Sequence, residues 1–299
     1  MPFHVGAAEQ LRRFNIIDNT TALAGSSGGA LAAISAGLNL DSEVLLSSTA
    51  NIAKKCRDDG PRNALRKALE EEFRSALPAD CCDMLRKRPA PCYIAYTEVK
   101  PFLKPHYVCD FNDRDDVIEV LSASCNVPFY FDGNKLCVNV RGSYGIDGLF
   151  STNVNRFGCP PTGATDLEIL ISPYSFSTLF APHLAKPANS SCKYALITPH
   201  LLTNKTDWPF SLVDVLQMSL NAPKARSFGK VAVSDADIDE TYRILYDAGR
   251  AAVRVWYEQH QLEPKISERE REEENSFQHS DQFHVVMRGL VHLFHLMNR

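Results

Sequence analysis

A glycine-rich pentapeptide near the start of the chain has the residue types that acyl transfer needs. Gly25-Ser26-Ser27-Gly28-Gly29 fits the pattern G-x-S-x-G, in which a serine sits on a sharp turn between a strand and a helix with its hydroxyl exposed. Glycines flank such a serine because a side chain there would collide with the neighbouring strand or helix. The motif therefore predicts a nucleophile at Ser27.

The segments beside the motif support this interpretation. Residues 20–24 are apolar enough for a short strand, and the alanine-rich residues 30–38 favour a helix. A glycine-serine linker, which is the alternative, would not have apolar segments so close on both sides. Only 24 residues precede Gly25, fewer than an α/β-hydrolase places before its serine turn. The pattern predicts either a fold whose serine follows an early strand or a fragment.

The rest of the chain alternates between helical and extended patterns, which predicts an α/β fold. Predicted helices lie at residues 2–14, 61–77, 115–124, 211–221 and 237–260. Predicted strands lie at residues 93–99, 107–111, 136–140, 167–172 and 194–198.

Composition excludes several classes of function. The formal charge of −4 argues against a nucleic-acid partner, and 44% hydrophobic residues is ordinary for a globular protein. No apolar run reaches the roughly 18 residues of a transmembrane helix, and the start of the chain has no signal-peptide pattern. Nine scattered cysteines without a C-x-x-C pair are expected to be reduced, and no metal or cofactor is expected.

Four segments, taken together and in order, resemble the patatin-like phospholipase family, and its animal-type branch most. They are residues 3–8 (FHVGAA), 24–30 (AGSSGGA), 122–130 (SASCNVPFY) and 146–153 (IDGLFSTN). The resemblance spans about residues 3–155. It implies a three-layer α/β/α sandwich with a central, mostly parallel sheet, whose first strand has no counterpart in this sequence.

The resemblance implies a serine-aspartate dyad that hydrolyses glycerolipid esters of the triacylglycerol or phospholipid type. Ser27 matches the family nucleophile, and Asp147 with Gly148 matches its Asp-Gly-[Gly/Ala] motif, although Leu149 stands where the family has a small residue. Of the other Asp-Gly pairs, one precedes Pro61 at a helix start and one is typical of a turn. In this mechanism Asp147 takes the proton of Ser27 and later activates water.

One part of the family pattern has no match. The family forms its oxyanion hole from a glycine-rich loop ahead of the first helix and from the amide after the nucleophile, so Gly28 is the one donor implied here. This predicts either a start that has been truncated or a chain without catalysis. The alternative function is then a module that binds a lipid surface or a partner protein.

The domain organisation expected from the sequence has three parts. Residues 1–160 form the patatin-like core, residues 161–262 complete the α/β domain, and residues 263–299 hold a charged segment and an amphipathic helix. One face of this helix carries Phe283, Val286, Leu290, Phe294 and Met297. The expected partners are a glycerolipid and, further, a lipid-droplet or membrane surface. The expected location is cytoplasmic.

Overall fold

The computed structural model describes residues 1–133, 135–152, 156, 158–164, 166–173, 193–202, 208–210 and 233–262. Residues Met1–Trp256 form one compact unit and Tyr257–Arg299 a second. The predicted helices at residues 211–221 and in residues 263–299 lie outside the described residues. The predicted boundaries at residues 160 and 262 stay predictions.

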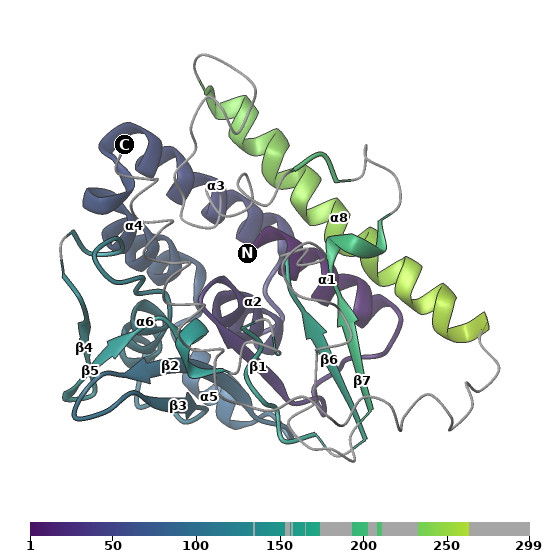
Figure 1. The fold of residues 1–299 in the computed structure, drawn as a ribbon, viewed down its shortest axis with the longest axis horizontal. Coiled ribbons are helices and arrows are strands. Elements are labelled where there is room, and N and C mark those ends of the chain that lie inside the picture. Colours follow the sequence, from purple (N-terminus) through teal and green to yellow (C-terminus); the bar gives the residue numbers. More distant parts are fainter. Residues whose placement is uncertain are drawn as a thin grey trace, which may run out of the picture. The chain divides into compact units, whose positions relative to one another are not determined.

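Helices and strands alternate along the described chain (Figure 1). In the first half they are α1 (Pro2–Arg13), β1 (Leu23–Ser26), α2 (Gly28–Gly37), α3 (Ser42–Asp59), α4 (Pro61–Ala76), α5 (Cys81–Arg86), β2 (Cys92–Glu98), β3 (Lys104–Val108) and α6 (Arg114–Ser124). They continue as β4 (Val138–Val140), β5 (Ser143–Ile146), the 3-10 helix η1 (Gly148–Ser151), β6 (Leu167–Ile171), β7 (Lys193–Ile197), the 3-10 helix η5 (Pro199–Leu201) and α8 (Asp235–Leu262). This alternation confirms the α/β class.

The sheet that carries the serine turn is mixed. Strands β1 and β2 pair in parallel, with Ser26 opposite Ala95. β3 and β5 pair antiparallel to β2, and β4 pairs antiparallel to β5, while β6 and β7 form a parallel pair of their own. Because β1 and β2 are parallel, their carboxyl ends lie at the same edge, where α/β proteins place their ligands.

Helices α2 and α6 pack against β2 and supply much of the buried core. On α2, Ile34 is fully buried, and Gly37 lets the helix approach Cys92 of β2. On α6, Val117, Val120 and Leu121 have no exposed surface, and they follow the three- and four-residue spacing of one helical face. A mixed sheet packed against helices fits the α/β/α arrangement of the patatin fold.

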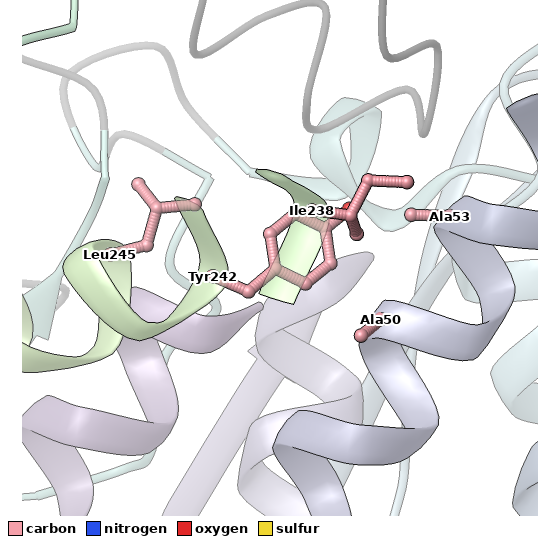
Figure 2. Packing of buried hydrophobic residues seen from close by; sticks show 5 residues of the cluster. All are labelled: Ala50, Ala53, Ile238, Tyr242 and Leu245. Atoms are coloured by element: carbon pink, nitrogen blue, oxygen red, sulfur yellow. The ribbon is translucent and has the colours of Figure 1, made fainter. Parts of the chain in front are cut away.

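Helix α8 is held against α1 and α3 by small residues. A Cβ on Gly6 would lie 2.0 Å from the carbonyl oxygen of Tyr246, so glycine is required for the close approach of α1 and α8. On the α3 side, the alanines Ala50 and Ala53 leave room for the ring of Tyr242, and Figure 2 shows this ring lying between the two helices. The small side chains of these two alanines thus allow one large aromatic ring to pack closely between the helices.

Several elements differ from the sequence-based expectation in position or in existence. The first strand ends at Ser26 rather than Ala24, so the serine turn follows it directly. The strand expected at residues 107–111 is β3, which begins at Lys104. Helices α3 and α5 and the strand β5 were not predicted.

Candidate active site

Ser27 occupies a strained backbone conformation between β1 and α2. Its φ of 52° and ψ of −130° lie outside the regions that residues with a side chain normally adopt. Such a conformation costs roughly 1–3 kcal/mol and persists only where the surrounding structure enforces it. The turn holds the serine side chain half-exposed at the first turn of α2, which is the geometry of a nucleophile elbow.

The glycines of the motif differ in how strictly they are required. A Cβ on Gly25 would lie 2.1 Å from the carbonyl oxygen of Gly29, so no larger residue fits at position 25. A Cβ on Gly29 would meet only the His4 ring, at 3.7 Å, which is an ordinary contact. Gly148 resembles Gly25, because its Cβ would lie 2.1 Å from the carbonyl oxygen of Ala95.

Ser124 anchors the elbow to the sheet and to α6. The Ser27 amide donates a hydrogen bond to Ser124 Oγ at 2.9 Å, and Ser124 Oγ donates to the carbonyl oxygen of Ala95 at 2.6 Å. Ser124 is completely buried, so both bonds are shielded from water. One hydroxyl thus connects the last residue of α6, the middle of β2 and the backbone of the predicted nucleophile.

Asp147 is placed beside the elbow by contacts to its backbone. Its amide donates to the carbonyl oxygen of Asn126 at 2.9 Å, and its carbonyl oxygen accepts from Thr97 Oγ1 at 3.2 Å. Asn126 is itself buried and donates from Nδ2 to the carbonyl oxygens of Leu136 and Gly145. The loop after α6 and the end of β2 therefore position the carboxyl group jointly.

The Asp147 carboxyl is buried, with 2% of the residue exposed. Burial raises its pKa from 3.8 to about 7, although the Leu149 amide, which donates to Oδ1 at 2.8 Å, and the nearby Ser27 hydroxyl both lower it. Oδ2 accepts no hydrogen bond from the described residues. The site therefore holds a carboxylate whose basicity resembles that of imidazole, with one oxygen free to take a proton.

The Cys125 thiol lies near both side chains. It is close enough to Ser27 and Asp147 for both to influence its pKa, which burial raises well above the ordinary value. A thiol with a raised pKa stays protonated and serves as a small apolar wall beside the serine.

An apolar cavity of about 80 Å³ opens beside the serine. Ser27, Gly28 and Cys125 are among its lining residues, and the others are Met1, Pro173 and residues of α1, α2, α3, α4, α8 and the segment after α6. The apolar lining residues include Phe3, Leu31, Ile52, Leu65, Leu69, Val127, Phe131 and Leu245. A cavity of this chemistry suits a hydrocarbon chain whose carbonyl end lies at Ser27.

The Gly28 amide is the donor nearest to the serine along the chain. It lies at the N-terminus of α2, where the first amides have no partner within the helix and the helix dipole favours negative charge. No described residue accepts a hydrogen bond from it. Met1 packs against Gly28, since a Cβ there would lie 3.3 Å from the Met1 nitrogen, so the start of α1 borders the same space.

The structure brings together the residues that the sequence singled out: Ser27, Gly28 and Asp147 meet at one edge of the sheet. Leu149 is 40% exposed, and one of its methyl groups lies close to Gly158. Sequence reasoning missed the supporting roles of Thr97, Ser124 and Asn126. Two of these lie in the quoted segment at residues 122–130, but their partners are backbone atoms far away in the sequence.

No group of three or more His, Cys, Asp or Glu side chains within the described ranges could hold a metal ion. Of the described helices, none is both long and apolar enough to cross a membrane.

An α/β fold with a strained serine after a parallel strand and a buried aspartate beside it defines a class of serine hydrolase-like proteins. Residues 1–157 match the family model described as patatin-like phospholipase. Because this match covers more than half of the chain, the protein belongs to the patatin-like phospholipase family.

Two human proteins are among its relatives. Over 159 residues the chain is 26% identical to 1-acylglycerol-3-phosphate O-acyltransferase PNPLA3, covering 51% of this chain and 32% of that protein. Over 190 residues it is 30% identical to patatin-like phospholipase domain-containing protein 4, covering 58% of this chain and 67% of that protein. The chain thus spans about a third and about two thirds of these relatives.

Proposed function

We propose that this protein hydrolyses acyl esters of glycerolipids, of the triacylglycerol or phospholipid type, through a Ser27-Asp147 dyad. One observation carries the proposal: the strained serine turn places a hydroxyl beside a buried carboxyl group whose pKa is raised to about 7. A base with a pKa near the working pH combines a large deprotonated fraction with a useful proton affinity.

In the first step, the Ser27 Oγ attacks the ester carbonyl carbon while its proton passes to Asp147 Oδ2. The negative charge that develops on the carbonyl oxygen is stabilised by the Gly28 amide and the positive end of α2. The tetrahedral intermediate then expels the alcohol of the glycerolipid, which takes the proton from Asp147. An acyl group remains bound to Ser27.

The second step returns the serine to its starting state. Asp147, again a carboxylate, takes a proton from a water molecule that attacks the acyl carbonyl. Ser27 leaves as the alcohol with this proton, and the fatty acid is released. The cavity supports this assignment, because Ser27 lines it together with mostly apolar side chains, which suit an acyl chain.

We propose that the protein acts in the cytoplasm, at the surface of a lipid droplet or a membrane. Glycerolipids with long acyl chains reside in such phases rather than in water, so the enzyme must meet its substrate at a surface. The alternative is a module of the same fold that binds a lipid or a partner without catalysis. In that case Ser27 would not react as a nucleophile.

The test is labelling by an alkyl fluorophosphonate, which reacts with activated serines, combined with hydrolysis of a glycerolipid ester. We expect the wild-type protein to be labelled at Ser27 and to release fatty acid. The Ser27→Ala variant should do neither, and Ser47→Ala, which changes an exposed serine on α3, should do both. Equal labelling and hydrolysis by Ser27→Ala and wild type would contradict the dyad, and absence of both in the wild type would favour the binding module.

A further inference from the structure

The tip of the β2–β3 hairpin presents two large apolar side chains to solvent. Phe102 is 81% exposed and its neighbour Leu103 is 49% exposed. Tyr144, whose carbonyl oxygen accepts a hydrogen bond from the Val99 amide at the base of the tip, is 43% exposed. Single exposed apolar residues are common on protein surfaces, but an adjacent group of them indicates a binding surface.

Two lysines enclose this apolar group. Lys100 and Lys104 flank the tip, both are exposed, and neither forms an ion pair with a carboxylate of the described residues. The Lys100 ammonium instead lies 4.8 Å from the centroid of the Tyr144 ring. Glu98, the acidic residue at the base of the hairpin, is bound to His106 at 2.7 Å. The tip therefore carries local positive charge on a chain whose net charge is −4.

The hairpin turn follows the carboxyl end of β2, at the same edge of the sheet where the site is formed. Ser26 pairs with Ala95, and β2 continues past that level to Glu98 before the chain turns. Glu98 then pairs with Lys104, so the turn is short and held by the sheet. From the same end of β2, Thr97 holds the backbone of Asp147. A surface that contacted the tip would face the edge at which Ser27 and Asp147 lie.

We infer that the segment from Lys100 to Lys104, here called the hairpin tip, docks the protein on an anionic lipid surface. Phe102 and Leu103 would enter the boundary between head groups and acyl chains, where burial of apolar side chains is favourable. Lys100 and Lys104 would remain at the level of the head groups and attract anionic lipids. The unpaired lysines favour this occupant over an apolar protein groove, which would bury their charge.

This inference extends the proposed function by naming the surface that would bring the site to its substrate. Docking does not require hydrolysis, so the two can be tested separately. Binding is measured by flotation with vesicles of phosphatidylcholine alone or of equal parts phosphatidylcholine and phosphatidylserine. All proteins carry Ser27→Ala so that the lipids stay intact.

Two tip variants and two matched controls separate the contributions. Phe102→Ser with Leu103→Ser removes the apolar group, and Lys100→Gln with Lys104→Gln removes the charge. Val44→Ser alters a valine on α3 that is 49% exposed, as Leu103 is, and Lys87→Gln alters an exposed lysine after α5. All the altered side chains are on the surface, so circular dichroism should show an unchanged fold.

We expect the parent protein to float with the anionic vesicles. The apolar variant should bind at least about tenfold more weakly, and the lysine variant about fivefold more weakly per lysine at low salt. The controls should bind as the parent does. Equal binding by parent and tip variants, or a parent that binds no vesicles, would overturn the inference. It would also be overturned if the tip variants lost a protein partner while vesicle binding was unchanged.

Discussion

The two sides of the site are built in different ways. The Ser27 side is a local construction: a short strand, a turn enforced by Gly25, and a helix that follows at once. The Asp147 side depends on residues far away in the sequence, namely Thr97 and Asn126, and on burial of the carboxyl group. Backbone strain orients the Ser27 side chain, whereas desolvation raises the pKa of the Asp147 carboxyl group. The two sides should therefore respond differently to substitution and to pH.

The largest expected effect lies on the aspartate side, in the pH dependence of stability. A shift in pKa from 3.8 to about 7 means that folding favours the protonated form of Asp147. The contribution of this group to stability is full below about pH 3.8 and is lost as the pH rises through about 7. The shift corresponds to about 4 kcal/mol at most.

Asp147→Asn removes this titration. Relative to the variant, the wild type should lose stability between about pH 4 and pH 7, as measured by urea unfolding at a series of pH values. Glu240→Gln, which alters an exposed carboxylate on α8, serves as the control and should leave the pH profile of the wild type nearly intact. A constant difference between wild type and Asp147→Asn over this range would mean that the carboxyl group is not desolvated.

The second-largest expected effect is on stability, and it tests the turn that holds Ser27. Gly25→Ala should destabilise the fold by about 3 kcal/mol or more, because its Cβ would lie 2.1 Å from a backbone oxygen that cannot move without breaking the turn. Gly29→Ala, at 3.7 Å from the His4 ring, should change stability by less than about 1 kcal/mol. Thermal unfolding measures both. Similar melting temperatures for the two variants would show that the turn is less constrained than the structure indicates.

A smaller effect concerns Ser124, the anchor that connects the elbow to α6. Ser124→Ala leaves the Ser27 amide and the Ala95 carbonyl without their hydroxyl partner and should cost about 1–3 kcal/mol. It should also slow fluorophosphonate labelling about tenfold, because the nucleophile is no longer held in position.

Ser122→Ala is the matched control for this anchor. Ser122 is equally buried on α6 but bonds to Glu70 rather than to the elbow. The control should lose stability without a change in the labelling rate of the folded protein. If both variants slowed labelling to the same extent, Ser124 would have a general structural role and no specific positioning role.

The smallest effect is on chain-length preference, since Tyr242 separates the apolar cavity from a polar groove between α3 and α8. Tyr242 lines both spaces, and Lys54, Asp239 and Arg243 are among the residues that line the groove. Tyr242→Leu should lengthen the cavity and shift labelling of Ser27 severalfold toward fluorophosphonates with longer chains.

Tyr242→Phe keeps the ring and is the control. It should retain the preference of the wild type, because the phenylalanine ring fills the space that the tyrosine ring occupies beside Ala50 and Ala53 (Figure 2). An unchanged ratio of long-chain to short-chain labelling in a folded Tyr242→Leu protein would show that the cavity does not hold the chain.

The same contrast explains what could be predicted from the sequence. The serine turn was recognisable because its glycines and its flanking segments are neighbours in the chain. Asp147 could be chosen among the Asp-Gly pairs through the resemblance to the family and because the other two pairs fit a helix start and a turn. Its raised pKa follows from burial that no short motif encodes. The roles of Ser124 and Asn126 depend on backbone partners such as Ala95 and Gly145, which only the folded chain brings close.

The elements that were missed have local causes. α3 contains Ser47, Ser48 and Thr49 in a row, and such residues weaken a helical pattern because their side chains compete for backbone hydrogen bonds. Its start was nevertheless signalled by Asp41, whose side chain accepts a hydrogen bond from the Glu43 amide. β5 is a four-residue strand that includes Gly145, where a Cβ would lie 2.9 Å from Val140. A strand so short, with a glycine inside it, gives little alternation to detect.

The most direct test of the account is the pH dependence of the labelling rate at Ser27, measured by mass spectrometry for the wild type and Asp147→Asn. If Asp147 is the base, the wild-type rate should rise with pH to half its maximum near pH 7, where the buried carboxyl group ionises. The Asp147→Asn protein should be labelled far more slowly and without this step. Labelling of Asp147→Asn at the wild-type rate, with the same midpoint, would contradict the central claim.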